Sequence, residues 1–349
     1  WDAFRHARRL ARRAQPFDML YANSQKAFVV SAIAGGLARR PVVWHLRDIL
    51  APPHFRRANV RAVVWLANRC ASRVIANSHA TAHAFVSAGG NASLVRVVHN
   101  GIDAAPFDTV TDDDARACRV ELGVPPETPL VVHVGRFHHW KGQHVLLRAL
   151  AHVPRAHAWF IGAPLFGEEA YGAELRIEAE RLGVSSRVRF LGFRDDVPRL
   201  MRAADLIVHS SVYPEPFGRV VVEGMLAGRP VIASRAGGVE EIVSDGETGW
   251  LVPPDDAGAL VADRRRVVVV AQRGVFGACR DKLAGLLDGS DALGDRVGVV
   301  FIGDGEQAKS LASVEMLCRE FAREGLLRGD AVVALGGGVV GDTAGFAAA

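Results

Sequence analysis

Two glutamates lie in one segment where they could bind a sugar or a nucleotide. Glu215 precedes an apolar helix expected over Val220 to Ala227, and Glu223 is the charged residue within that helix. A buried carboxylate without a partner is costly, so Glu223 needs hydrogen-bond donors or a positive charge. The vicinal hydroxyls of a sugar or a ribose would serve. The alternative is that Glu223 lies on a narrow solvated stripe and that Glu215 only precedes a turn.

The start of the same helix has the features of an anion site. Pro216, Phe217 and Gly218 open the helix, where free N–H groups and the positive end of the helix dipole favour phosphate. We therefore expect phosphate and hydroxyl recognition side by side. Further along, Glu240 and Glu241 are expected to be acids in the first turn of the next helix, not catalysts.

A second basic element occurs upstream, in the sequence HVGRFHHWKGQ at 133–143. It reads as a strand followed by a loop that carries Arg136 and Lys141. An arginine fork and a lysine charge can hold a diphosphate and stabilise it as a leaving group. Two solvated bases in a loop are the alternative. His138 and His139 are adjacent, which is poor metal-ligand spacing, so we interpret them as loop residues.

Short apolar strands that alternate with helices must position these side chains, and this alternation predicts an α/β fold with parallel sheets. In the middle of the chain strands are expected at 130–135, 157–162, 187–192, 205–210, 230–234 and 249–252. Ligands of open α/β sheets bind at the carboxyl ends of such strands. In the first part, VVWHLRD places His45 at a strand end, where it could donate to a sugar hydroxyl or serve only the structure, with Asp48 just beyond.

The chain divides into three predicted parts. Residues 1–107 form a first Rossmann-like domain, which we expect to be truncated by roughly two βα units because no opening strand with a glycine-rich turn precedes Asp18. A polar stretch leads into the second domain, 108–262. A new βα series begins after the DRRR run and gives a third, partial domain at 263–349.

Composition sets the class of protein. The 349 residues are 49% hydrophobic, which excludes a disordered chain, and the net charge of +4 suits phosphorylated ligands without requiring nucleic acid. The four cysteines form no CxxC pair, so we expect reduced thiols, a cytoplasmic protein and no metal site. The N-terminal WDAFRHARRLARR predicts a basic helix, either an ordinary exposed one or one that contacts the inner face of the membrane peripherally.

Residues 17–262 resemble retaining nucleotide-sugar glycosyltransferases of the two-Rossmann GT-B architecture, of the glycosyl transferases group 1 type. The segment PEPFGRVVVEGMLAGRPVIASRAGGVEEIVSDGETGWLVPP, with two glutamates separated by seven residues, carries most of the resemblance, and HVGRF…KG adds to it. The resemblance implies transfer of a sugar from a nucleoside diphosphate sugar to a glycan or lipid-linked acceptor, without a cofactor.

The resemblance also implies site roles. It assigns catalysis to Arg136, Lys141, Glu215 and His45, with Glu215 near the donor sugar. It places Gly135 and the backbone of Phe217 and Gly218 against the donor, and it has Glu223 accept hydrogen bonds from the ribose.

Residues 264–349 resemble the NAD-binding half of dehydroquinate synthase and related sugar-phosphate cyclases, through GDGEQAKSL and VVALGGGVVGDTAGFAAA. The resemblance implies NAD binding by three groups of residues: Asp304, Glu306 and Lys309 at the adenosine side, Gly336, Gly337 and Gly338 at the pyrophosphate, and Gly341 and Asp342 at the nicotinamide. A tight β-to-α turn without a ligand is the alternative. The zinc ligands of that family have no counterpart before Ala349.

The sequence therefore predicts a retaining glycosyltransferase. A dehydroquinate synthase-like, NAD-binding cyclase fragment and a non-catalytic fusion product remain as alternatives.

Overall fold

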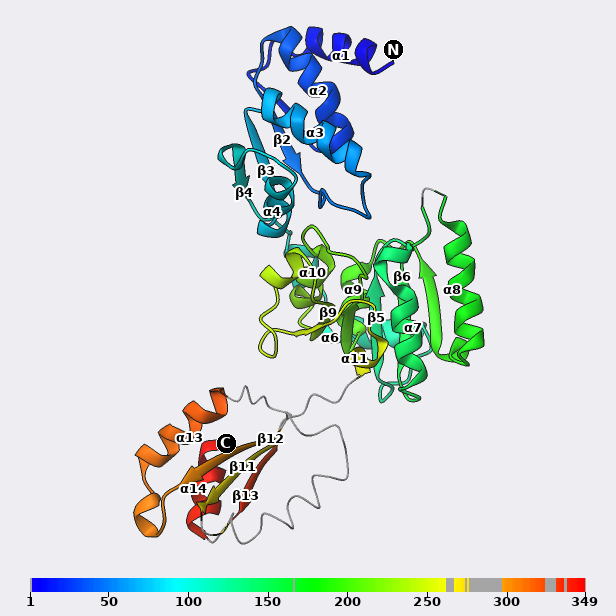
Figure 1. The fold of residues 1–349 in the computed structure, drawn as a ribbon. Coiled ribbons are helices and arrows are strands. Elements are labelled where there is room, and N and C mark those ends of the chain that lie inside the picture. The colour runs from blue at the N-terminus through cyan, green and yellow to red at the C-terminus, as the bar shows by residue number, and fades with distance from the viewer. Residues whose placement is uncertain are drawn as a thin grey trace. The chain divides into compact units, whose positions relative to one another are not determined.

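The structure is a computed structural model that describes residues 2–165, 167–261, 267–273, 275, 297–323, 331–335 and 338–348. The chain forms two compact units, Trp1–Val261 and Ala262–Ala349. The first unit contains two parallel sheets, each with its own helices, which we call the first lobe and the second lobe (Figure 1). The predicted α/β class is confirmed.

The first lobe is a four-stranded parallel sheet in the order β1-β2-β3-β4. Its elements are α1 (Asp2–Arg13), β1 (Leu20–Ala22), α2 (Gln25–Ala38), β2 (Val42–Leu46), α3 (Arg57–Cys70), β3 (Arg73–Ala76), α4 (His79–Ser87), η1 (Ala92–Leu94) and β4 (Val95–Val97). Ser24 and Ser78 begin α2 and α4 as N-caps, because each hydroxyl accepts a bond from the backbone N–H three residues on. Phe28 stacks on Trp44 in the core at a centroid distance of 4.5 Å.

The N-terminal basic helix, α1, packs on α2. Ala7 and Ala11 are buried in the lobe's core, while the arginines along the helix are exposed. Its small apolar face is thus used for packing within the lobe. Among the described residues, no helix has both the length and the apolar character needed to cross a membrane.

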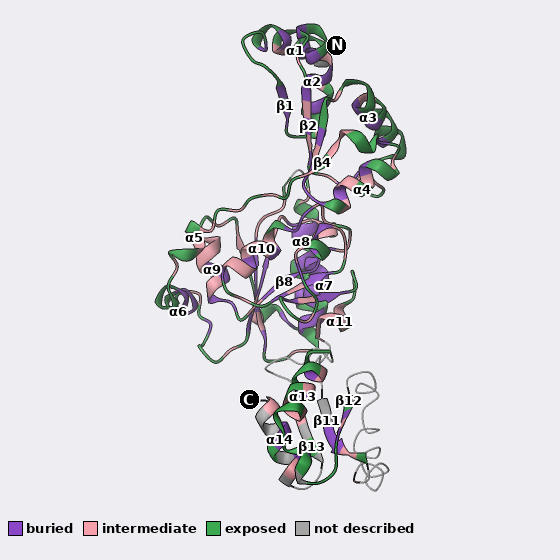
Figure 2. Ribbon diagram, turned by 90° about the vertical axis from the view of Figure 1, so that its left-hand side faces the viewer, coloured by how far each residue is buried: buried purple, intermediate pink, exposed green. Residues whose placement is uncertain are grey.

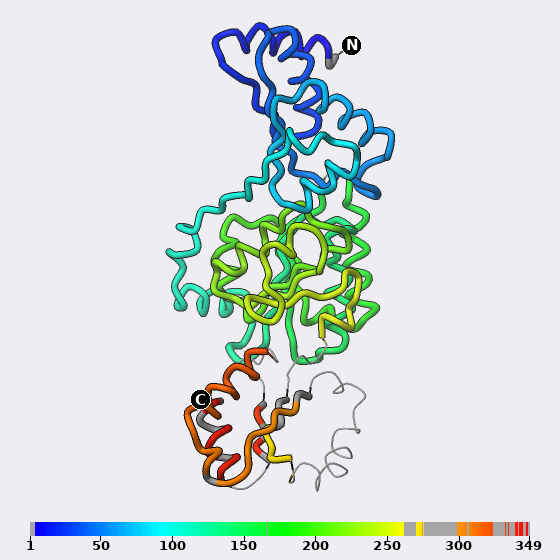
Figure 3. The backbone as a smooth tube through the Cα atoms, turned by 60° about the vertical axis from the view of Figure 1, so that its left-hand side comes forward, coloured from blue at the N-terminus to red at the C-terminus, as the bar shows by residue number. Residues whose placement is uncertain are grey.

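The second lobe follows through α5 (Ala105–Asp108) and α6 (Asp112–Glu121), a passage that Figure 3 traces. Its remaining elements are β5 (Leu130–Val134), η2 (His139–Lys141), α7 (Gln143–Ala151), β6 (His157–Ile161), α8 (Glu169–Arg181), η3 (Ser185–Arg187), β7 (Val188–Gly192), α9 (Val197–Ala203), β8 (Leu206–His209), α10 (Arg219–Leu226), β9 (Val231–Ser234), η4 (Gly238–Glu241), β10 (Trp250–Val252) and α11 (Ala257–Val261). The six strands predicted from the apolar runs are all present. Thr111 and Asp114 form a capping box at the start of α6.

The six strands are parallel and lie in the order β10-β9-β8-β5-β6-β7. The chain therefore starts in the middle of the sheet, builds outward to β7, and returns to β8 on the other side of β5. The strand order reverses between β5 and β8. In open α/β sheets, ligands bind in the crevice outside the carboxyl ends of the strands at this reversal.

Both faces of the six-stranded sheet are covered, which explains the continuous apolar character of its strands. Side chains alternate between two hydrophobic clusters: Trp159 and Ile161 pack with α9, whereas Ala158 and Phe160 pack with α7 and α8. Figure 2 shows the buried strands within the lobe. A doubly covered sheet holds the strand ends rigidly, so the loops after β5 and β8 start from fixed positions.

The second unit contains a three-stranded parallel sheet in the order β12-β11-β13. Its described elements are β11 (Val267–Gln272), β12 (Val297–Ile302), η6 (Glu306–Ala308), α13 (Leu311–Arg323), β13 (Ala331–Leu335) and α14 (Gly338–Ala348). Val270, Val300, Leu317 and Val340 form the centre of its core.

Candidate functional site

The predicted basic loop and the first predicted glutamate meet at the strand reversal of the second lobe. Lys141 ends η2, after β5, and Glu215 follows β8. These two strands are neighbours in the sheet, although 74 residues separate the two side chains. The Lys141 ammonium donates a short hydrogen bond to Glu215 Oε1. The crevice where α/β proteins bind ligands thus holds a partly buried ion pair.

Two further side chains fix the carboxylate of Glu215. The hydroxyl of Ser211 donates to Oε1 at 2.9 Å, and His209 Nε2 lies 3.4 Å from the same oxygen. Burial by itself would raise the pKa of Glu215, but the charge of Lys141 and the bond with His209 outweigh burial and hold that pKa well below its usual range. Glu215 is therefore a carboxylate at neutral pH.

A second buried histidine contacts the backbone of Lys141. His133, at the end of β5, lies 3.1 Å through Nε2 from the carbonyl oxygen of Lys141. Burial, followed by the neighbouring His209, lowers the pKa of His133 to about 3. His133 is thus neutral in the folded protein and adds no charge beside the ion pair.

Arg136 lies on the same side of the sheet as Lys141. Its guanidinium stands 5.5 Å from the ring centroid of Trp140, and Gln143 donates to its carbonyl oxygen at 2.9 Å. Arg136, Lys141 and Glu215 line one cavity of about 250 Å³. The structure therefore brings together three of the four predicted catalytic residues, and their roles remain a prediction.

The fourth, His45, occupies a different position. It lies on β2 of the first lobe, where the hydroxyl of Tyr21 is 2.7 Å from Nδ1, and it is not among the residues that line the cavity. Its Nε2 is buried and has no hydrogen-bond partner within the described chain. Burial, followed by the charge of Arg47, lowers the pKa of His45. The side chain that reaches the cavity from this strand end is Asp48.

One of the predicted donor residues, Gly218, lines a smaller cavity beside the ion pair. Gly218 lines a cavity of about 90 Å³ together with Lys141 and Glu215. Gly218 has φ 96° at the N-cap of α10, a left-handed conformation that glycine adopts without strain. Phe217 is buried. Gly135 packs closely against Gly162, because a Cβ added at Gly162 would lie 2.1 Å from the carbonyl oxygen of Gly135.

Glu223 has a partner within its own helix. Arg219 donates to its carboxylate at 2.6 Å, one turn earlier on α10. Val221 and Gly224 are the buried residues of α10, and the other side chains on its apolar surface are partly accessible. The carboxylate of Glu223 therefore has a charged neighbour before any ligand binds.

The cavity is also lined by residues of the first lobe, among them Asp48 and His54, and the sequence did not single out His54. His54 lies against Trp140 and Tyr213, at centroid distances of 4.7 and 5.8 Å. Burial lowers the pKa of His54, although Glu215 acts in the opposite direction. Burial also raises the pKa of Asp48. An apolar run and strand ends locate β2, but no motif marks the segment after it as part of the cavity wall.

Glu241 lies in the first turn of η4, as expected, but its carboxylate contacts another helix. It ends η4, and its carboxylate accepts bonds from the backbone N–H groups of His79 and Ala80, both at 2.8 Å. These N–H groups belong to the start of α4 in the first lobe. Glu241 therefore stabilises the N-terminus of a different helix from the one expected.

Comparisons with known proteins agree with this geometry. Residues 114–268 match the family Glycosyl transferases group 1, and residues 1–105 match Glycosyltransferase Family 4. HepE of Anabaena, solved in complex with UDP-glucose, is similar to this chain at 45% identity and a TM-score of 0.71. The match covers 79% of this chain and 72% of HepE. The chain belongs to the group 1 glycosyltransferases.

Two other relatives extend the comparison. D-inositol 3-phosphate glycosyltransferase of Mycobacterium sp. (strain KMS) is 40% identical over 191 residues, which cover 54% of this chain and 43% of that protein. Sucrose-phosphate synthase from Thermosynechococcus elongatus has a TM-score of 0.60 at 28% identity, over 70% of this chain and 63% of that one. This group 1 glycosyltransferase thus spans less than half the length of the curated relatives it matches.

The C-terminal unit of this group 1 glycosyltransferase is similar to a different family. Its residues 299–349 match the family 3-dehydroquinate synthase N-terminal. Lys309, after η6, forms an ion pair with Asp342 of α14 at 3.0 Å. Asp304 precedes η6, and Gly338 and Gly341 lie on α14. Gly336 and Gly337 lie outside the described residues, and so does the side chain of Glu306. The predicted NAD contacts of this unit stay a prediction.

Proposed function

We propose that the protein transfers a glycosyl group from a nucleoside diphosphate sugar to a hydroxyl acceptor, with retention of anomeric configuration. The observation that carries this proposal is the Lys141–Glu215 ion pair beside Arg136 at the strand reversal. The family membership supports it, and so does HepE, which was solved with UDP-glucose, with UDP and glucose, and with UDP.

The chemistry follows from the charges in the cavity. When the bond between the anomeric carbon and the diphosphate oxygen breaks, its electron pair goes to the diphosphate. Arg136 and Lys141 place two positive charges where this negative charge develops, and such preorganised charges stabilise a transition state. The acceptor oxygen then bonds to the anomeric carbon, and its proton passes to the released diphosphate. Because two fixed cations perform this task, we propose that transfer needs no metal cofactor.

Glu215 has two tasks in this proposal. It neutralises Lys141 before the donor arrives, and its carboxylate then faces the donor sugar. Gly218 and the first N–H groups of α10 face the diphosphate, and Glu223 accepts bonds from the ribose. The wall formed by Asp48 and His54 places the acceptor. A glycan or lipid-linked acceptor is the class that the family resemblance implies.

Release of UDP from UDP-glucose by the full chain, with and without a panel of sugar and polyol acceptors, tests this function. We expect acceptor-dependent release, and α-configured product from an α-configured donor by NMR. A β-configured product would overturn retention. If UDP-glucose released no UDP and the other common nucleoside diphosphate sugars released no nucleoside diphosphate, the non-catalytic fusion product would be favoured.

The family match of residues 299–349 favours a second candidate function, which is NAD binding by the C-terminal unit. We propose that Asp304, Lys309 and Asp342 contact NAD, with Gly336, Gly337, Gly338 and Gly341 and the backbone of Glu306 completing the site. Calorimetry of the full chain with NAD checks this, with Lys309→Ala expected to weaken binding. Equal affinity in that variant, or no heat in the wild type, would remove the candidate.

A further inference from the structure

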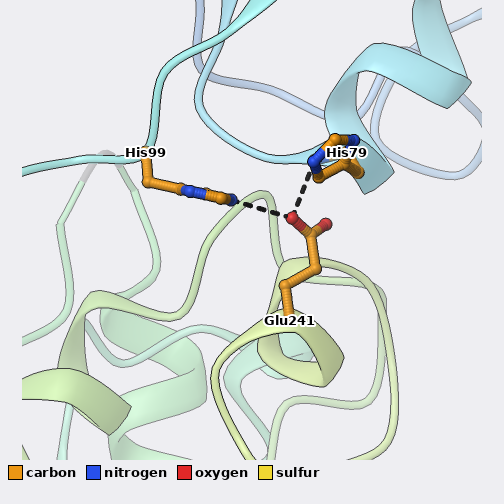
Figure 4. A group of neighbouring side chains, drawn as sticks. All are labelled: His79, His99 and Glu241. Carbon is orange, nitrogen blue, oxygen red and sulfur yellow. Dashed lines mark hydrogen bonds and ion pairs between the residues drawn. The ribbon is translucent and has the colours of Figure 1, made fainter.

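A cluster of three potential metal ligands lies where the first lobe meets the second lobe. It consists of His79 at the start of α4, His99 after β4, and Glu241 at the end of η4 (Figure 4). Each residue offers one ligand atom, and these atoms lie within 4.8 Å of one another. No step of the proposed glycosyl transfer uses this cluster. Its chemistry therefore needs a separate explanation.

The carboxylate of Glu241 is held in a fixed orientation. Its Oε2 accepts from the N–H of His79 and its Oε1 from the N–H of Ala80, each at 2.8 Å. Each carboxylate oxygen has two lone pairs, so these bonds leave acceptor capacity on both. In metal sites, hydrogen bonds of this kind to a ligating carboxylate hold it in orientation. Glu241 is thus positioned before an ion arrives.

The two imidazoles are accessible and close to this carboxylate. His99 Nε2 lies 3.0 Å from Glu241 Oε2, and the His99 side chain is 52% exposed. The ring of His79 lies 5.9 Å from that of His99, centroid to centroid. An ion can therefore reach the cluster from solvent.

The ligand set and its spacing select the class of ion. Imidazole nitrogen suits Zn²⁺, Ni²⁺ and Co²⁺, whereas Ca²⁺ and Mg²⁺ require oxygen ligands. Two histidines and a glutamate with an open fourth position form a known zinc ligand set. With metal–ligand bonds of about 2.0 Å, tetrahedral ligand atoms lie about 3.3 Å apart. The distance of 3.0 Å between His99 Nε2 and Glu241 Oε2 is already close to this value. Rotation of the exposed His79 ring would bring a ring nitrogen of His79 to a similar distance from both atoms.

We propose that His79, His99 and Glu241 bind a divalent transition-metal ion of the Zn²⁺ class and that this ion joins the two lobes. The ligands come from both lobes, so one ion would fasten α4 to η4. A neighbouring contact lies in the same place, because Thr81 Oγ1 donates to the carbonyl oxygen of Pro216 at 3.2 Å. The bound ion would therefore also restrain the segment that leads to Phe217 and Gly218.

Titration of the tag-free, EDTA-treated full chain with Zn²⁺ by calorimetry, and with Co²⁺ by absorption, tests the site. We expect one saturable high-affinity ion in the wild type and at least a tenfold loss of affinity in each of His79→Asn, His99→Asn and Glu241→Gln. His83→Asn is the matched control, because His83 is an exposed histidine four residues further on α4 and lies outside the cluster. Wild-type affinity in His99→Asn, or no saturable ion in the wild type, overturns the proposal.

Hydrogen exchange separates a joining ion from a merely bound one. We expect Zn²⁺ to slow amide exchange at 79–82 and at 238–242 together, because both segments would be held by one ion. Slowing at only one of these segments would overturn the joining of the lobes. His99→Asn keeps the two backbone bonds to Glu241 and loses only the side-chain contact, so its circular dichroism without metal should match the wild type and exclude a folding defect.

Discussion

Lys141 reaches across from the loop after β5 to the carboxylate of Glu215 after β8, and the two charges neutralise each other in the crevice of the second lobe. The side chains are 26% and 14% exposed. Each charge in such a shielded pair depends on the other. If one is removed, the remaining charge is poorly solvated and destabilises the fold. The Lys141–Glu215 ion pair keeps a cation beside the expected diphosphate position, and the carboxylate keeps that cation from attracting other anions.

Lys141→Ala should therefore affect both stability and activity. We expect a loss of about 3 kcal/mol in the free energy of unfolding from the buried carboxylate left unpaired, and a fall of about 10²- to 10³-fold in kcat. The pKa of Glu215 should rise. Urea denaturation and UDP release measure the first two effects, with Lys26→Ala as the control, because Lys26 is an exposed lysine of α2. Unchanged kcat with reduced stability would make the pair purely structural.

Glu223→Ala separates ribose recognition from helix stabilisation. If Glu223 binds the ribose, KM for UDP-glucose should rise about tenfold with kcat nearly unchanged, because the interaction is present in ground state and transition state alike. Arg219→Ala removes the same intrahelical pair but keeps the Glu223 carboxylate, at a cost of about 0.3–0.5 kcal/mol. Steady-state kinetics on both variants decides: equal KM values in the two would show that Glu223 acts only through Arg219.

The parts of this site that the sequence predicted are those with local signals. The apolar runs located β5 and β8, and the basic loop and the PEPFG segment located Arg136 and Glu215. The pairing of Lys141 with Glu215 depends on strand order, since β6 and β7 intervene in the chain but lie on the other side of β5. Residues brought in by tertiary packing, such as His54, have no local signal at all.

Glu241 is a second residue whose chemistry the sequence predicted but whose partner it did not. Its position near a helix start was correctly interpreted as favourable for an acid, but the helix it serves is α4, 161 residues earlier. Helix N-termini attract carboxylates from any part of the chain. Local sequence identifies the chemistry of such an acid, whereas its partner depends on how the lobes pack.

The pH dependence of stability should report the buried His133. Its pKa is about 3 in the folded protein and about 6.5 in an unfolded chain, so between these values the unfolded state binds the extra proton. Stability therefore falls as the pH is lowered from about 6.5 towards 3, by up to ~1.4 kcal/mol per pH unit from this group. His133→Asn should flatten the profile relative to the wild type, measured by urea denaturation at several pH values. His83→Asn should leave the slope unchanged, and an unaltered slope in His133→Asn would contradict the prediction.

Gly142 connects Lys141 to α7, and its replacement should displace the lysine. Its φ of 67° is left-handed, and an added Cβ would lie 1.8 Å from the carbonyl oxygen of Ser210, so the loop cannot keep its place. We expect Gly142→Ala to cost about 3 kcal/mol or more in the free energy of unfolding, and to reduce kcat because Lys141 and Glu215 no longer align. Gly36→Ala is the matched control: nothing lies within 4 Å of its added Cβ, and its place inside α2 makes alanine stabilising by up to about 1 kcal/mol. Denaturation curves and UDP release on both variants check this, and wild-type activity in Gly142→Ala would show that the loop tolerates another path.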